Sequence, residues 1–135
     1  MNRPSAYVPE GVIPAVLLPF HEDLSIDEAS YRAHLRDVAA VEGVSAITTN
    51  AHASEVASCT FDEQRRVLEI TTDEVGARLP VVSGIYADGS LEAARLAKMA
   101  QAAGAAALLV FPPGITTFGQ RPEMAVEHFK RIADA

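Results

Sequence analysis

The chain contains no tryptophan, a single cysteine, and only 11 lysine and arginine residues among its 135 positions. The one cysteine, Cys59, has no partner for an internal disulfide, so the fold does not depend on such a cross-link. Basic residues never form a run longer than two, and the formal net charge is −7 at pH 7. The sequence therefore excludes a basic face that follows a phosphate backbone, and with it a nucleic-acid partner.

Long apolar runs are also missing. The longest uninterrupted one, 105–111, is far shorter than the roughly 18 residues that cross a bilayer, which excludes a membrane-spanning segment. The N-terminus lacks the succession of basic, apolar and small residues that marks a signal peptide. With 49% apolar and 21% charged residues, the composition is that of one globular domain, which we expect to be soluble and cytoplasmic.

Four apolar, β-rich runs alternate with four stretches of helical periodicity. Residues 1–10 carry two prolines without periodicity and are expected to form an irregular arm. Three of the predicted helices close on glycines, at Gly43, Gly76 and Gly104. The expected strands are 11–20, which is interrupted and ended by proline and expected to be buried on both faces, then 44–49, 81–85 and 105–111.

Capping signals place the helix starts. Ser25-Ile26-Asp27-Glu28 and Thr60-Phe61-Asp62-Glu63 both fit the capping box, and Asp88 or Ser90 is expected to cap a third helix. Pro122 is suited to the first position of a fourth helix, which we expect to run through Ile132. In the third helix a face of small residues is expected to pack closely on the sheet, formed by Leu91, Ala94, Ala97 and Ala100.

The β-α order repeated four times predicts an α/β fold with a parallel sheet covered by helices. No glycine-rich loop of the dinucleotide-binding kind follows any predicted strand, which disfavours a doubly wound nucleotide-binding sheet. A (β/α)₈ TIM barrel is favoured, but such a barrel needs about 250 residues. We therefore predict about four βα units, with residues 11–135 forming the N-terminal half of a barrel domain after the 1–10 arm.

Polar side chains crowd together where the second predicted strand ends. After the run Ser45-Ala46-Ile47 the sequence reads Thr-Thr-Asn-Ala-His-Ala-Ser-Glu, and the Thr60 cap follows shortly after. In a parallel βα fold this is a loop at the carboxyl end of a strand, where barrel enzymes bind their ligands. We expect the chemistry of the chain to be organised around this stretch.

The sequence resembles the dihydrodipicolinate synthase and N-acetylneuraminate lyase family of class I aldolases. The resemblance is colinear over nearly the whole chain and rests on these motifs: Gly11-Val12-Ile13-Pro14-Ala15 with Pro19-Phe20, Ser45-Ala46-Ile47, Glu55, Asp62-Glu63, Pro80-Val81-Val82-Ser83-Gly84 and His128-Phe129-Lys130-Arg131-Ile132-Ala133. It implies a homo-oligomeric barrel, a tetramer or dimer, that needs no cofactor and binds pyruvate or another small 2-oxo acid as a Schiff base. The family lysine of strand six and the relay tyrosine of strand five would both lie outside this chain.

No catalytic residue of that family is expected within these 135 residues. The only lysines, Lys98 and Lys130, fall on predicted helices, where we expect solvated side chains rather than the desolvated amine that imine formation needs. The chain alone is therefore expected to be inactive.

The resemblance also implies a substrate-binding loop in which this chain departs from the family. The family pattern Gly-Thr-Thr-Gly-Glu falls here on Ala51-His52-Ala53-Ser54-Glu55, and Asn50 precedes it; these six residues are the expected substrate-binding set. His52 could donate to a carboxylate in place of the relay threonine, which would favour a different or longer 2-oxo acid, or it could be a loop residue bonded to backbone.

The other polar residues of this set have structural alternatives. The Glu55 carboxylate could serve loop amides and a helix N-terminus, Ser54 could form a turn, and the Asn50 amide could tie down the loop instead of touching ligand.

A second departure follows the fourth predicted strand, where the family carries a Pro-Tyr-Tyr type segment. Here 111–118 contains no tyrosine, which puts the family's intersubunit tyrosine in doubt, and Thr116 and Thr117 are expected to be ordinary loop residues. Tyr86 lies near a strand end, but a structural phenol is expected. Cys59 is expected to be a buried small residue, and the isolated His21, His34 and His128 show no metal-ligand spacing, so we predict no metal site.

The leading hypothesis is a lyase of this family in which a 2-oxo acid forms a lysine imine. The alternative is a catalytically inactive family member, or a fragment of one, that binds a carboxylate ligand or a partner.

Overall fold

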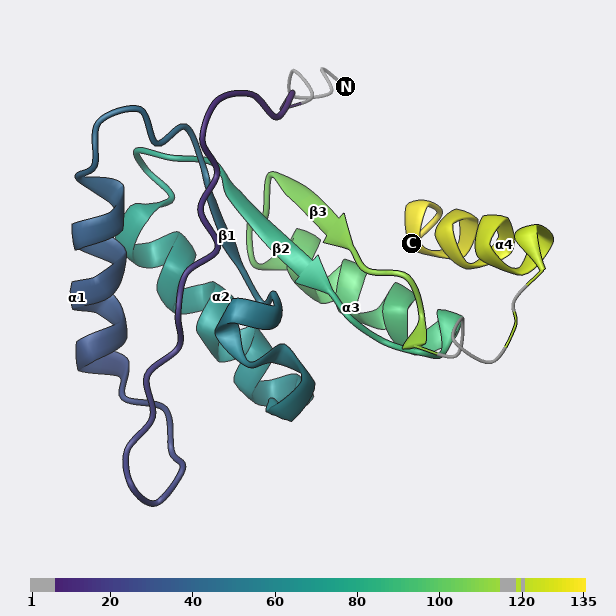
Figure 1. Ribbon diagram of the computed structural model, residues 1–135, viewed down its shortest axis with the longest axis horizontal. Coiled ribbons are helices and arrows are strands. Elements are labelled where there is room, and N and C mark those ends of the chain that lie inside the picture. The colour runs from purple at the N-terminus through teal and green to yellow at the C-terminus, as the bar shows by residue number, and fades with distance from the viewer. Residues whose placement is uncertain (1–6, 115–118, 120) are drawn as a thin grey trace.

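The computed structural model describes residues 7–114, 119 and 121–135 of the chain (Figure 1). Residues 7–10 form no regular element, and the rest of the expected 1–10 arm lies outside the described residues. The regular elements follow the expected β-α alternation: α1 Glu28–Ala39, β1 Ile47–Thr49, the 3₁₀ turns η1 His52–Ser54 and η2 Val56–Ser58, α2 Phe61–Val75, β2 Val81–Ile85, α3 Ser90–Ala102, β3 Ala107–Val110 and α4 Pro122–Ala133.

The three strands form one parallel sheet in the order β1-β2-β3. β2 has the predicted bounds, whereas β1 and β3 are shorter than the predicted runs 44–49 and 105–111. Parallel strands that follow one another in sequence and in space, each joined by a helix, are the βαβ units that the sequence predicts.

The predicted first strand is not a regular strand. Residues 11–18 lie beside β1 (Figure 1), but they pair only through the isolated parallel bridges Val12–Val44 and Ala15–Thr48. Pro14 and Pro19 have no N–H group to donate, which explains why the ladder is broken. Burial on both faces is also wrong, because Val16 is buried whereas Leu17 is 61% exposed.

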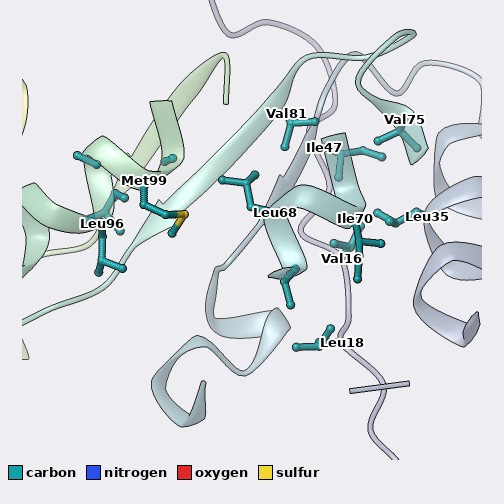
Figure 2. Packing of buried hydrophobic residues seen from close by; sticks show 14 of the residues in the cluster. Val16, Leu18, Leu35, Ile47, Leu68, Ile70, Val75, Val81, Leu96 and Met99 are labelled. Carbon is teal, nitrogen blue, oxygen red and sulfur yellow. The ribbon is translucent and has the colours of Figure 1, made fainter. Parts of the chain in front are cut away.

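The core lies between the sheet and the helices that cover one of its faces. Figure 2 shows Val16 and Ile47 together with Leu35 of α1 and Ile70 of α2. Val81 and Ile85 of β2 belong to the same cluster, which continues into α3 through buried residues. Because successive strand side chains point to opposite faces, the residues between these core positions lie on the uncovered face; they are Leu17, Thr48, Val82, Gly84 and Leu109.

Two of the predicted caps are wrong and one is confirmed. Thr60 begins α2 with a complete capping box, in which its hydroxyl accepts from the Glu63 N–H and the Glu63 carboxylate accepts from the Thr60 N–H. At α1 the cap is Asp27 instead of Ser25, because the Asp27 carboxylate accepts from the Ser30 N–H at 3.0 Å. The α3 cap, Gly89, makes no side-chain capping bond.

The helix ends follow the glycine signals closely. α2 ends with Gly76 as its C-cap, and Gly104, with φ +88°, lies two residues beyond the last residue of α3. Gly43 also has a positive φ, but it lies four residues beyond the end of α1, at Ala39. On α3 the expected small-residue face is displaced, since Leu91 is 77% exposed and the buried side is formed by Ala93, Leu96, Ala97, Met99 and Ala100.

Candidate functional site

The carboxyl ends of β1, β2 and β3 bring three loops to one edge of the sheet. These loops are 50–60, 86–89 and 111–114, counted over the described residues. In parallel βα folds this edge is the one that binds ligands, because the loops there vary without disturbing the strands. The expected binding set Asn50 to Glu55 lies in the first of the three loops.

A chain of buried hydroxyl groups fixes the end of β1 beneath the loop. The Tyr31 hydroxyl lies 2.8 Å from both Thr49 Oγ1 and Thr71 Oγ1, and Thr71 Oγ1 donates to the Val67 carbonyl at 2.8 Å. Because that carbonyl can only accept, the Thr71 hydroxyl must accept from Tyr31, and the Tyr31 hydroxyl must in turn accept from Thr49. Burial raises the pKa of Tyr31, so its phenol keeps the proton that it donates.

Asn50 holds the loop in place. Its side chain is 2% exposed, its backbone is left-handed with φ +52°, and its amide nitrogen donates to the Gln64 carbonyl at 2.9 Å. Gly84 of β2 leaves room for this turn, since a Cβ at Gly84 would overlap the Asn50 carbonyl oxygen and lie 3.1 Å from the Ala51 nitrogen. The geometry favours the structural alternative for the Asn50 side chain.

In the sequence, Gly84 stands only as the last residue of the motif Pro80-Val81-Val82-Ser83-Gly84, with no role of its own. An isolated glycine inside a strand pattern signals a close backbone approach, and that signal was present. What the sequence could not give is the partner of the approach, which comes from a loop more than 30 residues away.

Ser54 also anchors the loop. Its hydroxyl is buried and donates to the Val16 carbonyl at 2.7 Å, so it ties the loop to the segment that precedes α1. Ala51 is buried beside it, at 3% exposure. The structural alternative therefore fits Ser54 as well, and the surface that faces solvent is left to His52, Ala53 and Glu55.

The loop offers backbone donors. Ser54 and Val56 donate their N–H groups to the Ala51 carbonyl, and Glu55 donates to the His52 carbonyl. The N–H groups of Ala51, His52 and Ala53 donate to no residue that the structure describes. Glu55 joins the two 3₁₀ turns with φ +54°, so the loop holds two of the three non-glycine residues with positive φ in the described chain. Strained backbone of this kind concentrates at ligand sites.

His52 links the three loops through its ring. The imidazole is exposed, lies 4.3 Å from the Phe111 ring at an interplanar angle of 31°, and meets the Tyr86 ring edge-on at 5.4 Å. Tyr86 and Phe111 are half-buried and contact each other at 6.3 Å. None of the described residues forms a hydrogen bond with the His52 ring, so a His52 bonded to backbone finds no support there. None forms one with the Tyr86 hydroxyl either, so the structural role expected for Tyr86 rests on its ring contacts alone.

Glu55 is exposed and lines a groove of about 480 Å³ with Ala53 and with side chains before and on α1: Leu17, Leu18, Pro19, Ser30 and His34. Among the described residues, none forms a hydrogen bond or ion pair with its carboxylate. The nearest helix start, Thr60, is already capped by Glu63. The expected structural role of Glu55 at that helix therefore finds no support in the geometry.

The remaining candidates lie away from this edge or are unreactive. Lys98 on α3 and Lys130 on α4 are exposed, as expected. Cys59 is half-buried, and burial raises the pKa of its thiol, with the Glu63 and Glu55 charges acting in the same direction. Thr116 and Thr117 lie outside the described residues.

Among the described residues, no group of three or more His, Cys, Asp or Glu side chains could hold a metal ion. No helix of that part of the chain is long and apolar enough to cross a membrane.

The family model described as "Dihydrodipicolinate synthetase family" matches residues 8–135. The chain belongs to this family. Among curated relatives it is 34% identical over 126 residues to a 4-hydroxy-tetrahydrodipicolinate synthase of Methanothermobacter thermautotrophicus and 35% identical to one of Agrobacterium fabrum. It covers 44% and 42% of these two proteins, so the chain spans less than half the length of the relatives that it matches.

Solved structures of the dihydrodipicolinate synthetase family share the fold. The dihydrodipicolinate synthase of Aquifex aeolicus matches with a TM-score of 0.83 and 27% identity, over 92% of this chain and 41% of that one. The Escherichia coli K12 protein YagE, solved in complex with pyruvate, matches with a TM-score of 0.82 and 26% identity, over 92% and 41%. The fold is thus that of a (β/α)₈ TIM barrel family, of which this chain forms about half, as predicted.

Proposed function

We propose that this chain supplies the carboxylate-binding loop of a lyase that acts on pyruvate or a related 2-oxo acid through a lysine Schiff base. The lysine and its relay tyrosine would come from outside these 135 residues. The observation that carries the proposal is the loop after β1, which presents the His52 and Ala53 N–H groups at the carboxyl edge of the sheet, where they donate to none of the described residues.

The backbone supports carboxylate binding without a basic side chain. The N–H groups of His52 and Ala53 are successive donors at the start of η1, and such groups bind anions well. Asn50 and Ser54 hold these N–H groups in place through buried hydrogen bonds. Ligand binding therefore costs little conformational entropy in the loop. The synthase activity by which the relatives are named and the pyruvate bound in YagE belong to those proteins, and they support the same substrate class here.

His52 takes the place of the family threonine and serves as the side-chain donor of the loop. The rings of Phe111 and Tyr86 hold the imidazole above the loop by stacking and edge contact. A protonated imidazole gives the carboxylate a charge-assisted hydrogen bond, which a threonine hydroxyl cannot.

Borohydride trapping tests this proposal. The native protein is incubated with pyruvate and borohydride, and the mass of the modified peptide identifies the lysine. We expect one lysine to gain the mass of a reduced pyruvate adduct, and neither Lys98 nor Lys130 to be that lysine. A native protein that shows no adduct would refute the imine mechanism.

A second candidate, a member of the dihydrodipicolinate synthetase family that binds a carboxylate without turning it over, is favoured by two observations. Both lysines of the chain are exposed on helices, and 111–118 contains no tyrosine. Calorimetric titration with 2-oxo acids beside a lyase assay separates the two candidates. Binding without an adduct or turnover would favour the second, and turnover would exclude it.

A further inference from the structure

The uncovered face of the sheet leads up to an aromatic surface at the candidate site. Val82 and Gly84 point away from the helices, and the same alternation places Tyr86 on that side. Phe111 follows Leu109 in the same way, and Leu109 is 41% exposed. The rings of Tyr86 and Phe111 therefore lie on the face that a complete barrel would enclose, next to His52.

The three rings form one continuous surface. His52, Tyr86 and Phe111 come from three successive loops and are linked pairwise by centroid distances of 4.3, 5.4 and 6.3 Å. His52 stands within the loop that offers the backbone donors, so a carboxylate bound there places the rest of its molecule beside the rings. Asp88 helps to fix the third loop, because its carboxylate accepts from the Gly114 N–H at 2.6 Å.

Apart from His52, the side chains of these loops that are charged at pH 7 are acidic. The segments 50–60, 86–89 and 111–114 contain no lysine or arginine, whereas Glu55 and Asp88 are acidic. A second carboxylate on the substrate would find like charges here instead of a partner, and removing it from water without a partner is costly. An uncharged planar group would stack against the rings.

We propose that His52, Tyr86 and Phe111 form a specificity surface for the part of the 2-oxo acid beyond its oxo carbon. This surface selects substrates whose chain ends in an uncharged planar or apolar group and rejects those that end in a second carboxylate. The inference rests on the proposed 2-oxo acid site and adds the class of substrate to it.

Two 2-oxo acids of matched backbone test the proposal. 2-Oxo-4-phenylbutanoate and 2-oxoglutarate differ only in the group on the fourth carbon, a phenyl ring or a carboxylate. Borohydride trapping on the native protein is followed as a function of the concentration of each acid, with pyruvate as the reference. We expect 2-oxo-4-phenylbutanoate to reach half-maximal trapping at a concentration about tenfold lower than 2-oxoglutarate.

Variants assign the preference to the rings. Phe111→Leu and Tyr86→Leu remove a ring but keep an apolar side chain, and each is expected to reduce the preference about three- to tenfold. Tyr86→Phe keeps the ring and is expected to leave the preference unchanged. Because the same rings hold His52, a ring deletion also weakens pyruvate trapping, so the preference is taken as the ratio of the half-maximal concentrations of the two longer acids, from which a shared loss of carboxylate binding cancels. The urea midpoint of each variant shows that it is folded.

The outcomes separate the two proposals. Trapping of pyruvate together with equal or stronger trapping of 2-oxoglutarate would overturn the specificity surface and leave the lyase standing. A phenyl preference that survives both leucine variants would overturn its assignment to these rings. Failure to trap any of the three acids would overturn the lyase and the specificity surface with it.

Discussion

Removal of the Tyr31 hydroxyl tests whether the buried hydroxyl chain stabilises the scaffold of the site. Tyr31 is fully buried, and its hydroxyl both accepts from Thr49 and donates to Thr71. Tyr31→Phe keeps the ring and deletes two hydrogen bonds, each with a net contribution of about 1 kcal/mol. The Thr49 hydroxyl, itself 0% exposed, then has no acceptor and no access to water. We expect the free energy of unfolding to fall by about 2 kcal/mol.

Urea unfolding of the native protein measures this loss. With a slope of about 1 to 3 kcal/mol/M, the midpoint should fall by roughly 1 M. Tyr86→Phe is the matched control, because no described residue is hydrogen-bonded to the Tyr86 hydroxyl, and it should change the free energy of unfolding by less than about 0.5 kcal/mol.

A double variant separates the cost of the lost hydrogen bonds from the cost of leaving the Thr49 hydroxyl without an acceptor. Thr49→Val removes the partner that Tyr31→Phe leaves unsatisfied, so the double variant should be about 1 kcal/mol more stable than the sum of the single losses predicts. A loss in Tyr31→Phe no larger than in Tyr86→Phe, or single losses that simply add, would show that the hydroxyls do not act as a chain.

Three further perturbations have definite expected results. Gly84→Ala should lower the free energy of unfolding by about 1 to 3 kcal/mol and weaken 2-oxo acid binding, because the new Cβ overlaps the Asn50 carbonyl. Gly89→Ala is the control, since a Cβ there meets nothing within 4 Å. Equal losses of stability in urea unfolding would contradict the close approach at Gly84. Thr60→Ala should cost about 1 kcal/mol in the same assay by removing the α2 cap, and a change near zero would argue against it. Burial lowers the pKa of His128 below its ordinary value, so the unfolded chain binds a proton more readily than the folded one. The contribution of His128 to the free energy of unfolding should therefore be fully present above about pH 6.5 and decrease below it. Urea midpoints at pH 7.5 and 5.5 measure this decrease, which His128→Gln should lose.

Local signals in the sequence predicted most of the elements. The capping box at Thr60, the glycine after α2 and the proline at the start of α4 each act within a few residues, and each places a helix boundary where the structure has it. The failures also have local causes. At α1, Ser25 and Asp27 both suit a cap, and the competition was decided by Asp23, whose carboxylate accepts from the Ser25 hydroxyl at 2.6 Å.

The sequence by itself determined the parallel βα order, the likeness to the dihydrodipicolinate synthetase family and the loop from Asn50 to Glu55, because apolar periodicity, caps and motifs are written in neighbouring residues. Only the tertiary structure decided what each residue of that loop does. The Asn50 amide and the Ser54 hydroxyl became anchors since their partners, Gln64 and Val16, lie 14 and 38 residues away along the chain. His52 contacts Tyr86 and Phe111 only in the folded chain, because parallel strands bring loops that are distant in sequence to one edge of the sheet.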